Sequence, residues 1–269
     1  MITADLRHAL SRGELFLAFQ PKVSLVSGAI TGVEALIRWQ HPSRGVLLPL
    51  DFIHVAEDCG LIVQIGQWVL EAACLQAQAW LAAGLKLGTM AVNISAVEFR
   101  NDRFFESVCS TLKNTALEPS YLEIELTETA VMRDFEATCL VLQSLSEMGI
   151  RITVDDFGTG YTNFSYLNQF PIHMLKLDKS FVNEIPENAN MATIVRSVIH
   201  MGHSLHLQVV AEGVENAQQV KFLQANDCAE GQGYYFSKPV APGECRALLS
   251  HVERGGVWPL SSPTLPSFQ

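Results

Sequence analysis

Short apolar runs alternate with longer amphipathic stretches along most of this chain. The short runs are rich in β-branched and aromatic residues and predict strands at Leu15–Gln20, Ile30–Trp39, Gly88–Ser95, Tyr121–Leu126, Ile150–Val154, Met174–Asp178, Leu207–Ala211 and Gly233–Phe236. The longer stretches space their apolar residues as helices do, most clearly at Val63–Ala83, Phe104–Thr115, Asp134–Met148, Ala189–Leu205, Asn216–Ala225 and Pro242–His251. Strands that alternate with helices predict a mostly parallel sheet with helical crossovers.

The number and spacing of these strands favour a barrel. Eight strands in roughly 240 residues leave about 30 residues for each strand–helix unit, the amount of chain that a (β/α)8 barrel uses. A doubly wound open sheet is the alternative, but it usually carries a glycine-rich phosphate loop, and the chain has neither a GxGxxG nor a Walker motif. Only a short turn at Ser27-Gly28 joins the first two strands. We therefore expect an α/β fold, a modified (β/α)8 TIM-like barrel whose first strand is antiparallel.

This barrel is expected to occupy residues 1–252 as one domain. The remaining segment, 253–269, is rich in proline, glycine and serine, which is typical of a tail or linker. The sequence shows no internal repeat, and we predict no second domain.

Composition narrows the function classes. The 269 residues include 18 basic and 28 acidic side chains, for a net charge of −10, and 48% are hydrophobic. An acidic chain is a poor match for a polynucleotide backbone, although it can hold a small phosphorylated ligand through metal ions. The N-terminus is charged, no apolar run reaches the ~18 residues of a membrane span, and the six cysteines lie far apart. We expect a cytoplasmic chain whose cysteines are buried, reduced thiols.

Polar side chains mark the ends of the predicted strands. Barrel enzymes place their chemistry at the carboxyl ends of the strands. Each such side chain alone is more typical of a helix cap or a solvated edge, but together they would meet at one mouth. The set is Asn93, Glu125, Asp155, Asp156, Lys176 and Glu212, with Glu34 inside the second predicted strand and Gln232 at the start of the eighth.

Five carboxylates at one mouth require compensating positive charge, because they would otherwise repel one another and raise each other's pKa. Two divalent cations together with Lys176 would balance them. Oxygen ligands favour Mg²⁺ or Mn²⁺ over zinc. The adjacent pair Asp155 and Asp156, one of them bridging, suits two ions about 3.5–4 Å apart, an arrangement used for in-line phosphodiester hydrolysis.

The same residues resemble a known family. The run Glu34-Ala35-Leu36-Ile37-Arg38-Trp39 is similar to the signature of EAL domains, and the resemblance extends from about Leu6 to Leu249. Its ordered motifs include Gln20-Pro21, Val92-Asn93-Ile94-Ser95, Glu125-Leu126-Thr127-Glu128, Asp155-Asp156-Phe157-Gly158-Thr159-Gly160-Tyr161, Lys176-Leu177-Asp178, Ala211-Glu212-Gly213-Val214-Glu215 and Ser237-Lys238-Pro239.

The resemblance implies a phosphodiesterase that linearises cyclic di-GMP to 5′-pGpG with two Mg²⁺ or Mn²⁺ ions. It implies one metal on Glu34, Asn93, Glu125 and Asp155, and a second on Asp155, Asp156 and Glu212. Lys176 would hydrogen-bond the attacking water, Glu212 has been considered a general base in such sites, and Gln232 would lie beside the site.

The resemblance also implies the substrate contacts. Arg38 would contact a phosphate, and Gln20, Leu36, Asp178 and Glu215 would line the substrate pockets. Glu128 would anchor the loop 156–163, which links the metal site to a dimer interface. Two departures stand out: His54 replaces a usual proline near the substrate, and Tyr161-Thr162-Asn163-Phe164 replaces a commoner Ser-Ser-Leu sequence in the loop.

Two alternatives to this enzyme stay open. One is a receptor that binds cyclic di-GMP and acts through a partner, and the other is an enzyme for another small phosphodiester. We also expect a homodimer formed around the helices after the fourth and fifth strands, and a longer parent protein with sensor or cyclase domains. Two other features are expected to be structural: His200, His203 and His206 as surface residues, and Trp68 and Trp80 in core packing.

Overall fold

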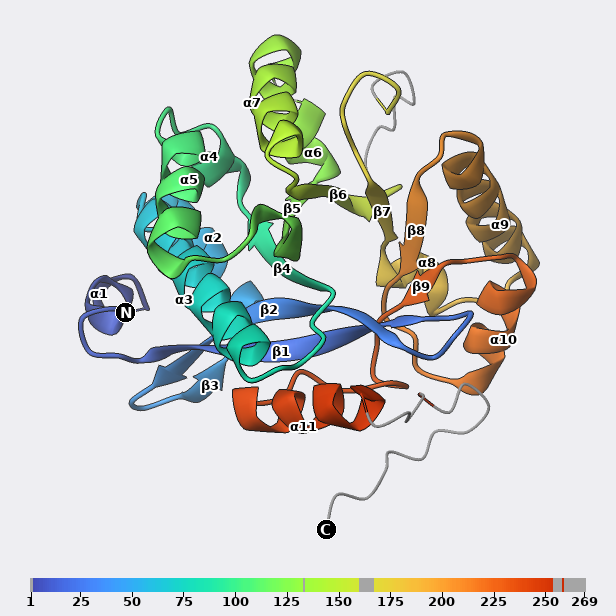
Figure 1. The fold of residues 1–269 in the computed structure, drawn as a ribbon, viewed down its shortest axis with the longest axis horizontal. Coiled ribbons are helices and arrows are strands. Elements are labelled where there is room, and N and C mark those ends of the chain that lie inside the picture. Colours follow the sequence, from blue (N-terminus) through green and yellow to red (C-terminus); the bar gives the residue numbers. More distant parts are fainter. Residues whose placement is uncertain (1, 133, 160–166, 254–257, 259–269) are drawn as a thin grey trace.

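The computed structural model describes residues 2–132, 134–159, 167–253 and 258. Their strands form one sheet in the order β1-β9-β8-β7-β6-β5-β4-β2-β3, and β1 also pairs with β2, which closes the sheet into a barrel (Figure 1). This confirms the modified (β/α)8 barrel and excludes an open sheet. The strands are β1 (Leu15–Ser24), β2 (Ile30–His41), β3 (Gly45–Leu47), β4 (Thr89–Ile94), β5 (Leu122–Thr127), β6 (Arg151–Phe157), β7 (Met174–Leu177), β8 (Gln208–Ala211) and β9 (Glu230–Gly231).

Helices surround the barrel (Figure 1). They are α1 (Ile2–Ala9), α2 (Pro49–Asp58), α3 (Ile62–Ala82), α4 (Ala96–Phe99), α5 (Phe104–Thr115), α6 (Glu128–Met132), α7 (Phe135–Glu147), α8 (Lys179–Val182), α9 (Ala189–Ser204), α10 (Ala217–Ala225) and α11 (Pro242–Glu253), with a 3₁₀ turn at Pro119–Tyr121. The six predicted helices are confirmed as α3, α5, α7, α9, α10 and α11, with similar bounds. The strand β3 and the helices α1, α2, α4, α6 and α8 were not predicted from the hydrophobic pattern.

The first strand is antiparallel, as predicted. β1 pairs with β2 from Leu15↔Trp39 to Val23↔Ile30, and β3 extends the far end of β2 antiparallel. In the turn between β1 and β2, the Ser24 hydroxyl oxygen accepts backbone N–H bonds from Val26 (3.3 Å) and Ser27 (3.1 Å). All pairings from β2–β4 through β8–β9 are parallel.

The predicted position of the eighth strand was wrong. The last barrel strand, β9, is Glu230–Gly231, whereas Gly233–Phe236 forms a turn. A Cβ at Gly233 would lie 2.2 Å from the backbone nitrogen and oxygen of Val214, so only glycine fits where this turn meets the neighbouring loop. Tyr235 and Phe236 are buried because they pack among residues of α9, α10 and β8, rather than because they belong to a strand.

The strands of the barrel separate apolar from polar side chains. In β5, Leu122, Ile124 and Leu126 join the apolar core between the strands and the helices. Glu123 and Glu125 alternate with them and reach lysines on β1 and β7, across the barrel interior. Barrel interiors are ordinarily filled with branched apolar residues, so this interior is unusually polar.

The predicted packing roles of the tryptophans are confirmed. Trp80 on α3 is buried, and its ring meets that of Phe19 on β1 edge to face, with 5.0 Å between centroids. Trp68 on the same helix packs against the same core while partly buried. These aromatic side chains fix α3 against the barrel.

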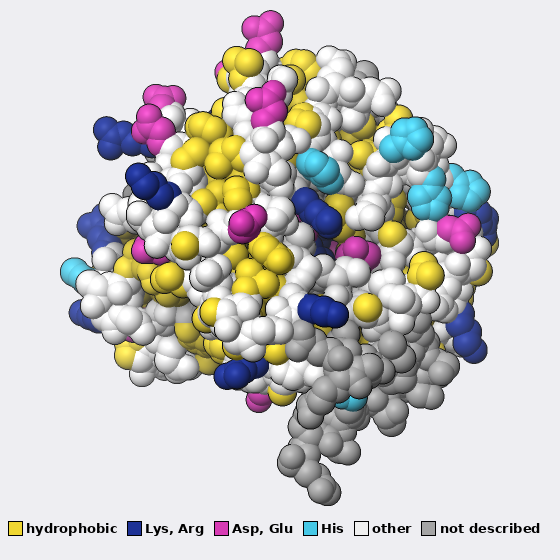
Figure 2. Space-filling view, in the orientation of Figure 1, with side chains coloured by type: hydrophobic (Ala, Val, Ile, Leu, Met, Phe, Trp, Pro, Cys, Tyr) yellow, Lys and Arg dark blue, Asp and Glu magenta, His cyan; other side chains and the backbone are white. Residues whose placement is uncertain are grey.

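The cysteines agree only in part with prediction. All six are free thiols, but Cys59, Cys109 and Cys139 are half-buried, and only Cys74, Cys228 and Cys245 are buried. Within the described ranges, no helix combines the length and the apolar character needed to cross a bilayer. On the face shown in Figure 2, basic and acidic side chains are interspersed and form no single basic patch.

The start of α4 contains a buried carboxyl group. The Ser95 hydroxyl oxygen accepts from the backbone N–H of Glu98, and Glu98 Oε2 accepts from the backbone N–H of Ser95, both at 3.1 Å. The Glu98 side chain fills space left by Gly66 on α3, where an added Cβ would lie 1.4 Å from Glu98 Oε1. Burial raises the pKa of Glu98 from 4.5 to about 7.

This carboxyl group makes stability depend on pH. Between pH 4.5 and 7 the folded protein retains a proton on Glu98 that the unfolded chain has released. The contribution of this group to the free energy of unfolding is therefore greatest below pH 4.5 and is lost as the pH rises through 7. We expect the free energy of unfolding of the Glu98→Gln variant to fall less over this range than that of the wild type, by about 3 kcal/mol at most. Urea titrations in EDTA at several pH values measure the difference, and parallel curves for the two proteins would contradict it.

Candidate active site

A cavity of about 780 Å³ opens at the carboxyl ends of the parallel strands. This size is within the ordinary range for sites that bind small molecules. One side is polar and contains seven of the eight polar residues predicted to meet at the mouth, and α2 and α3 form a more apolar wall that includes Ile53, His54 and Ile65. The polar lining comprises Glu34, Asn93, Glu125, Asp155, Asp156, Glu212 and Gln232.

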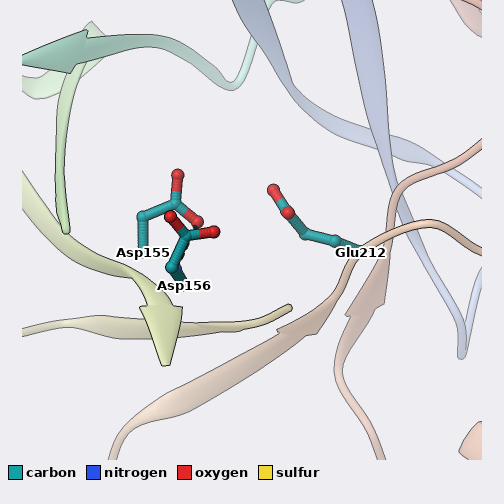
Figure 3. Close-up of side chains that lie close together, drawn as sticks. All are labelled: Asp155, Asp156 and Glu212. Atoms are coloured by element: carbon teal, nitrogen blue, oxygen red, sulfur yellow. Dashed lines mark hydrogen bonds between the residues drawn. The ribbon is translucent and has the colours of Figure 1, made fainter. Parts of the chain in front are cut away.

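Three of these carboxylates form a compact group. Asp155 and Asp156 lie at the end of β6 and face Glu212, which follows β8 (Figure 3). One oxygen from each lies within 4.8 Å of the others. Asp156 adopts a left-handed backbone conformation (φ 53°), and its N–H donates to Asp155 Oδ1 at 2.8 Å. This turn directs two successive carboxylates into one cavity, as the predicted second metal site requires.

Lys176 on β7 links this group to the predicted first metal site. Its side chain is fully buried. Its Nζ lies 2.6 Å from Glu125 Oε2 and Glu212 Oε1, 3.3 Å from Asp155 Oδ2 and 3.5 Å from Glu34 Oε2. One ammonium group therefore contacts four carboxylates, and Asp156 lies beside them.

One lysine does not balance the charge of the carboxylates around it. Burial and repulsion from neighbouring acids raise the pKa of Glu212 to about 7 and that of Glu125 well above its ordinary value. Burial and Asp155 likewise raise the pKa of Asp156. Burial would lower the pKa of Lys176, but the surrounding carboxylates raise it well above the ordinary value. The cluster thus favours additional positive charge, either protons or cations.

Amide side chains orient Glu34. Asn93 Nδ2 donates to Glu34 Oε1 and Gln232 Nε2 donates to Glu34 Oε2, both at 2.6 Å. Gln232 Nε2 also donates to Gln20 Oε1 at 3.1 Å. Burial would raise the pKa of Glu34, but Lys176 and these amides outweigh burial and lower it.

The donor set fits hard divalent cations. Every side-chain group of the two predicted metal sites offers oxygen, the donor that Mg²⁺ and Mn²⁺ prefer. In addition, Gln232 Oε1 is buried at the same place with no hydrogen-bond partner among the residues described. A buried polar atom of this kind ordinarily has a partner, which is consistent with a ligand bound here.

The predicted substrate-binding residues do not all line the cavity, unlike the carboxylates of the two predicted metal sites. Gln20, Leu36 and Glu215 line the cavity. Arg38 and Asp178 are not among its lining residues: Arg38 Nη1 donates to the Ile37 carbonyl oxygen at 2.8 Å, and Asp178 Oδ1 caps α8 by accepting from Ser180 N–H at 2.9 Å. Their contacts with substrate stay predictions.

Glu128 lies where the predicted loop anchor requires. It begins α6, it is buried, and its Oε2 accepts from the backbone N–H of Gly158 at 3.2 Å. It thereby connects α6 to the segment directly after Asp155 and Asp156. The rest of the predicted loop, including the departure at Tyr161-Thr162-Asn163-Phe164, falls outside the described residues.

Lys22 and Glu123 are charged interior residues that sequence reasoning missed. Lys22 Nζ lies 2.7 Å from Glu123 Oε1, and neither side chain is exposed. A signal was available for Glu123, which alternates with Glu125 along a predicted strand that should be buried on both faces. Lys22 lies beyond the predicted first strand, Leu15–Gln20, whereas the observed strand β1 extends to Ser24. By contrast, His200, His203 and His206 are exposed on α9 and the turn after it, as predicted.

Comparison with protein families matches residues 3–239 to the EAL domain. The chain belongs to the EAL domain family. This EAL domain is 44% identical over 248 residues to the bifunctional diguanylate cyclase/cyclic di-GMP phosphodiesterase MucR of Pseudomonas aeruginosa, covering 92% of this chain and 36% of MucR. It is 39% identical over 239 residues to the cyclic di-GMP phosphodiesterase PdeR of Escherichia coli, covering 89% of this chain and 36% of PdeR.

Solved structures resemble the EAL domain closely. The structure described as PaMucR phosphodiesterase in a c-di-GMP complex has a TM-score of 0.88 and 43% identity, and the match covers 91% of this chain and 99% of that chain. The EAL enzyme Bd1971 with cAMP and cyclic di-GMP bound has a TM-score of 0.87 and 33% identity, covering 92% of this chain and 68% of that one. The chain spans about a third of the length of the curated relatives MucR and PdeR.

Proposed function

We propose that this EAL domain hydrolyses cyclic di-GMP to linear 5′-pGpG with the help of two Mg²⁺ or Mn²⁺ ions. The observation that carries the proposal is the gathering of five carboxylates around Lys176 in one cavity of an EAL barrel. Relatives about 40% identical are named as cyclic di-GMP phosphodiesterases, and a structural relative is described with c-di-GMP bound. These names agree with the substrate that we propose.

The proposed metal ligands form two overlapping groups. One cation would be held by Glu34, Asn93, Glu125 and Asp155. The other would be held by Asp155, Asp156 and Glu212. Bound divalent cations supply positive charge that stabilises a transferring phosphoryl group and makes water a stronger nucleophile. The raised pKa values of Glu125, Asp156 and Glu212 are consistent with ligands that lack this charge.

The other polar residues would act on water and substrate. Lys176 would donate a hydrogen bond to the attacking water and stabilise negative charge on the phosphoryl oxygens. Gln232 and Asn93 hold Glu34 in place. Arg38 would contact a phosphate. The rest of the dinucleotide would be contacted by Gln20, Leu36, Asp178 and Glu215. Glu128 would hold the segment after Asp156.

The proposal extends to assembly. Residues 1–252 would form the phosphodiesterase domain, 253–269 would be a tail, and the domain would work in the cytoplasm within a longer protein that carries sensor or cyclase domains. It would pair with a second copy around the helices after the fourth and fifth predicted strands. α6 and α7 follow the fourth, and part of the segment after the fifth, 160–166, falls outside the described residues. Two apolar side chains support this surface, because Leu140 and Phe135 on α7 are 68% and 37% exposed.

Metal removal tests the proposed activity. We expect the purified chain to convert cyclic di-GMP to 5′-pGpG with Mg²⁺ or Mn²⁺, and EDTA to abolish the reaction, because the carboxylate cluster then lacks its compensating charge. Product chromatography measures both, and excess Mg²⁺ added after EDTA is the control for reversibility. Tight binding of cyclic di-GMP without turnover would support a receptor instead.

A further inference from the structure

A second layer of charge lies beneath the cluster at the mouth. Lys22 on β1 is 1% exposed, and its Nζ lies 2.7 Å from Oε1 of Glu123 on β5, which is fully buried. Glu123 also accepts hydrogen bonds from the hydroxyls of Thr89 on β4 (2.8 Å) and Thr153 on β6 (2.7 Å). Four strands thus hold one ion pair inside the barrel, and the proposed reaction uses none of its members.

This deep layer contacts the proposed metal site through one carboxylate. Lys22 Nζ lies 3.4 Å from Glu125 Oε1, and Lys176 Nζ lies 2.6 Å from Glu125 Oε2. The carboxylate of Glu125 is therefore placed between two ammonium groups, one below it and one at the mouth. Glu125 is 1% exposed, so both contacts are buried.

The hairpin leaves space for the lysine. Gly32 on β2 is the residue opposite Lys22 in the β1–β2 register. A Cβ at Gly32 would lie 3.1 Å from Lys22 Cε and 2.6 Å from Thr89 Oγ1. Any larger residue at position 32 would therefore displace the lysine stem, the threonine, or both.

Stability alone gives a weak reason for this arrangement. A buried ion pair often contributes no more than well-packed apolar residues of the same volume, and apolar residues ordinarily fill a barrel interior. Orientation of a metal ligand is a stronger reason. Carboxylates that bind metals are themselves held by outer hydrogen-bonding partners, and loss of such a partner typically lowers metal affinity about 10–100-fold.

We propose that Lys22 is a positioning residue for the metal centre. It holds Glu125 Oε1 toward the barrel interior, so that Oε2 faces the mouth, and the bonds from Thr89 and Thr153 to Glu123 fix Lys22 in turn. The inference rests on the proposed function, in which Glu125 is a metal ligand.

The test compares two variants that share one neutralised acid. Glu123→Gln retains Lys22 beside Glu125, whereas Lys22→Met with Glu123→Gln removes the lysine together with the charge of its partner at 2.7 Å. Mn²⁺ affinity is measured without substrate, from the electron paramagnetic resonance signal of free Mn²⁺. Circular dichroism and thermal melting in EDTA establish that each variant is folded.

We expect Mn²⁺ affinity to fall about 10-fold or more in the double variant relative to Glu123→Gln, with the Mg²⁺ concentration for half-maximal turnover rising in parallel. A structural role alone would lower the melting temperature and leave Mn²⁺ affinity unchanged. Equal or tighter Mn²⁺ binding by the folded double variant overturns the inference. If the double variant does not fold, Gly32→Ala replaces it, because the added Cβ crowds Thr89 Oγ1 (2.6 Å) and Lys22 Cε (3.1 Å) while every charge stays in place. Mn²⁺ affinity equal to that of the wild type would then overturn the inference.

Wild-type measurements separate this inference from the proposed function. A wild type that binds Mn²⁺ but leaves cyclic di-GMP intact refutes the proposed activity, and the comparison of Mn²⁺ affinities still decides the role of Lys22. A wild type that binds no Mn²⁺ refutes the metal centre and the role of Lys22 together.

Discussion

Replacing Asp155 with alanine is expected to lower kcat for cyclic di-GMP at least 100-fold. Asp155 belongs to both proposed metal sites, and its Oδ2 lies 3.3 Å from Lys176 Nζ. Loss of one preorganised charge at a transition state typically costs about 10²–10³-fold in rate, and the loss of a shared ligand affects both cations. Initial rates at saturating Mg²⁺ and substrate measure the effect.

Asp102→Ala is the matched control, because it removes an exposed aspartate remote in sequence from the cluster. It should retain the wild-type rate. The fold of Asp155→Ala is checked by thermal melting in EDTA, where removal of one crowded carboxylate relieves repulsion around Lys176. Turnover like that of the wild type in a folded Asp155→Ala protein would refute the shared-ligand assignment.

The second large effect is expected for Lys176→Met. This substitution leaves the carboxylates of Glu34, Glu125, Asp155 and Glu212 without their buried ammonium partner. Breaking a buried pair from one side typically costs about 3–5 kcal/mol. Without metal, we therefore expect a much lower free energy of unfolding, measured by urea titration in EDTA.

Added Mg²⁺ should reverse most of this loss of stability, because the cations replace the missing charge and bind only the folded state. The rise in melting temperature on adding Mg²⁺ should exceed that of the wild type. Turnover should nevertheless stay at least 100-fold lower, about the loss seen when one charge-stabilising donor is removed. Lys113→Met, at an exposed position on α5, should match the wild type in both assays. Full recovery of turnover with Mg²⁺ would show that Lys176 is structural.

The strand-end residues were predictable because a barrel gathers its strand ends. Asn93, Glu125, Asp155, Asp156, Lys176 and Glu212 meet as the predicted topology requires, and Glu34 reaches the same cavity from within β2. Gln232 also lines this cavity, but its position relative to the eighth strand differs from the predicted one. The eighth strand ends at Gly231, so Gln232 follows its carboxyl end instead of opening it.

The short elements were harder to predict because tertiary contacts define them. β3 has three residues and exists through its pairing with Trp39–His41 of β2. α4 has four residues, and its one sequence signal is the spacing of Ser95 and Glu98, a capping box. The deep lysine was missed for another reason, since hydrophobic periodicity leads one to expect apolar residues inside a barrel, and Lys22 and Glu123 violate that rule as a pair.

The seam between β1 and β9 is narrow. β1 and β9 share two residue pairs, Val23↔Gly231 and Ser24↔Glu230, and an isolated bridge joins Phe19 to Val240 farther along. Gln20 and Gln232 lie on opposite sides of this seam and hydrogen-bond across it, and Gln232 also holds Glu34. Ring closure and ligand orientation are therefore coupled. A fluctuation that separates β1 from β9 would remove the Gln232 hydrogen bond from Glu34, a proposed metal ligand, while Asn93 still holds its other oxygen and the other seven strand interfaces of the ring stay intact.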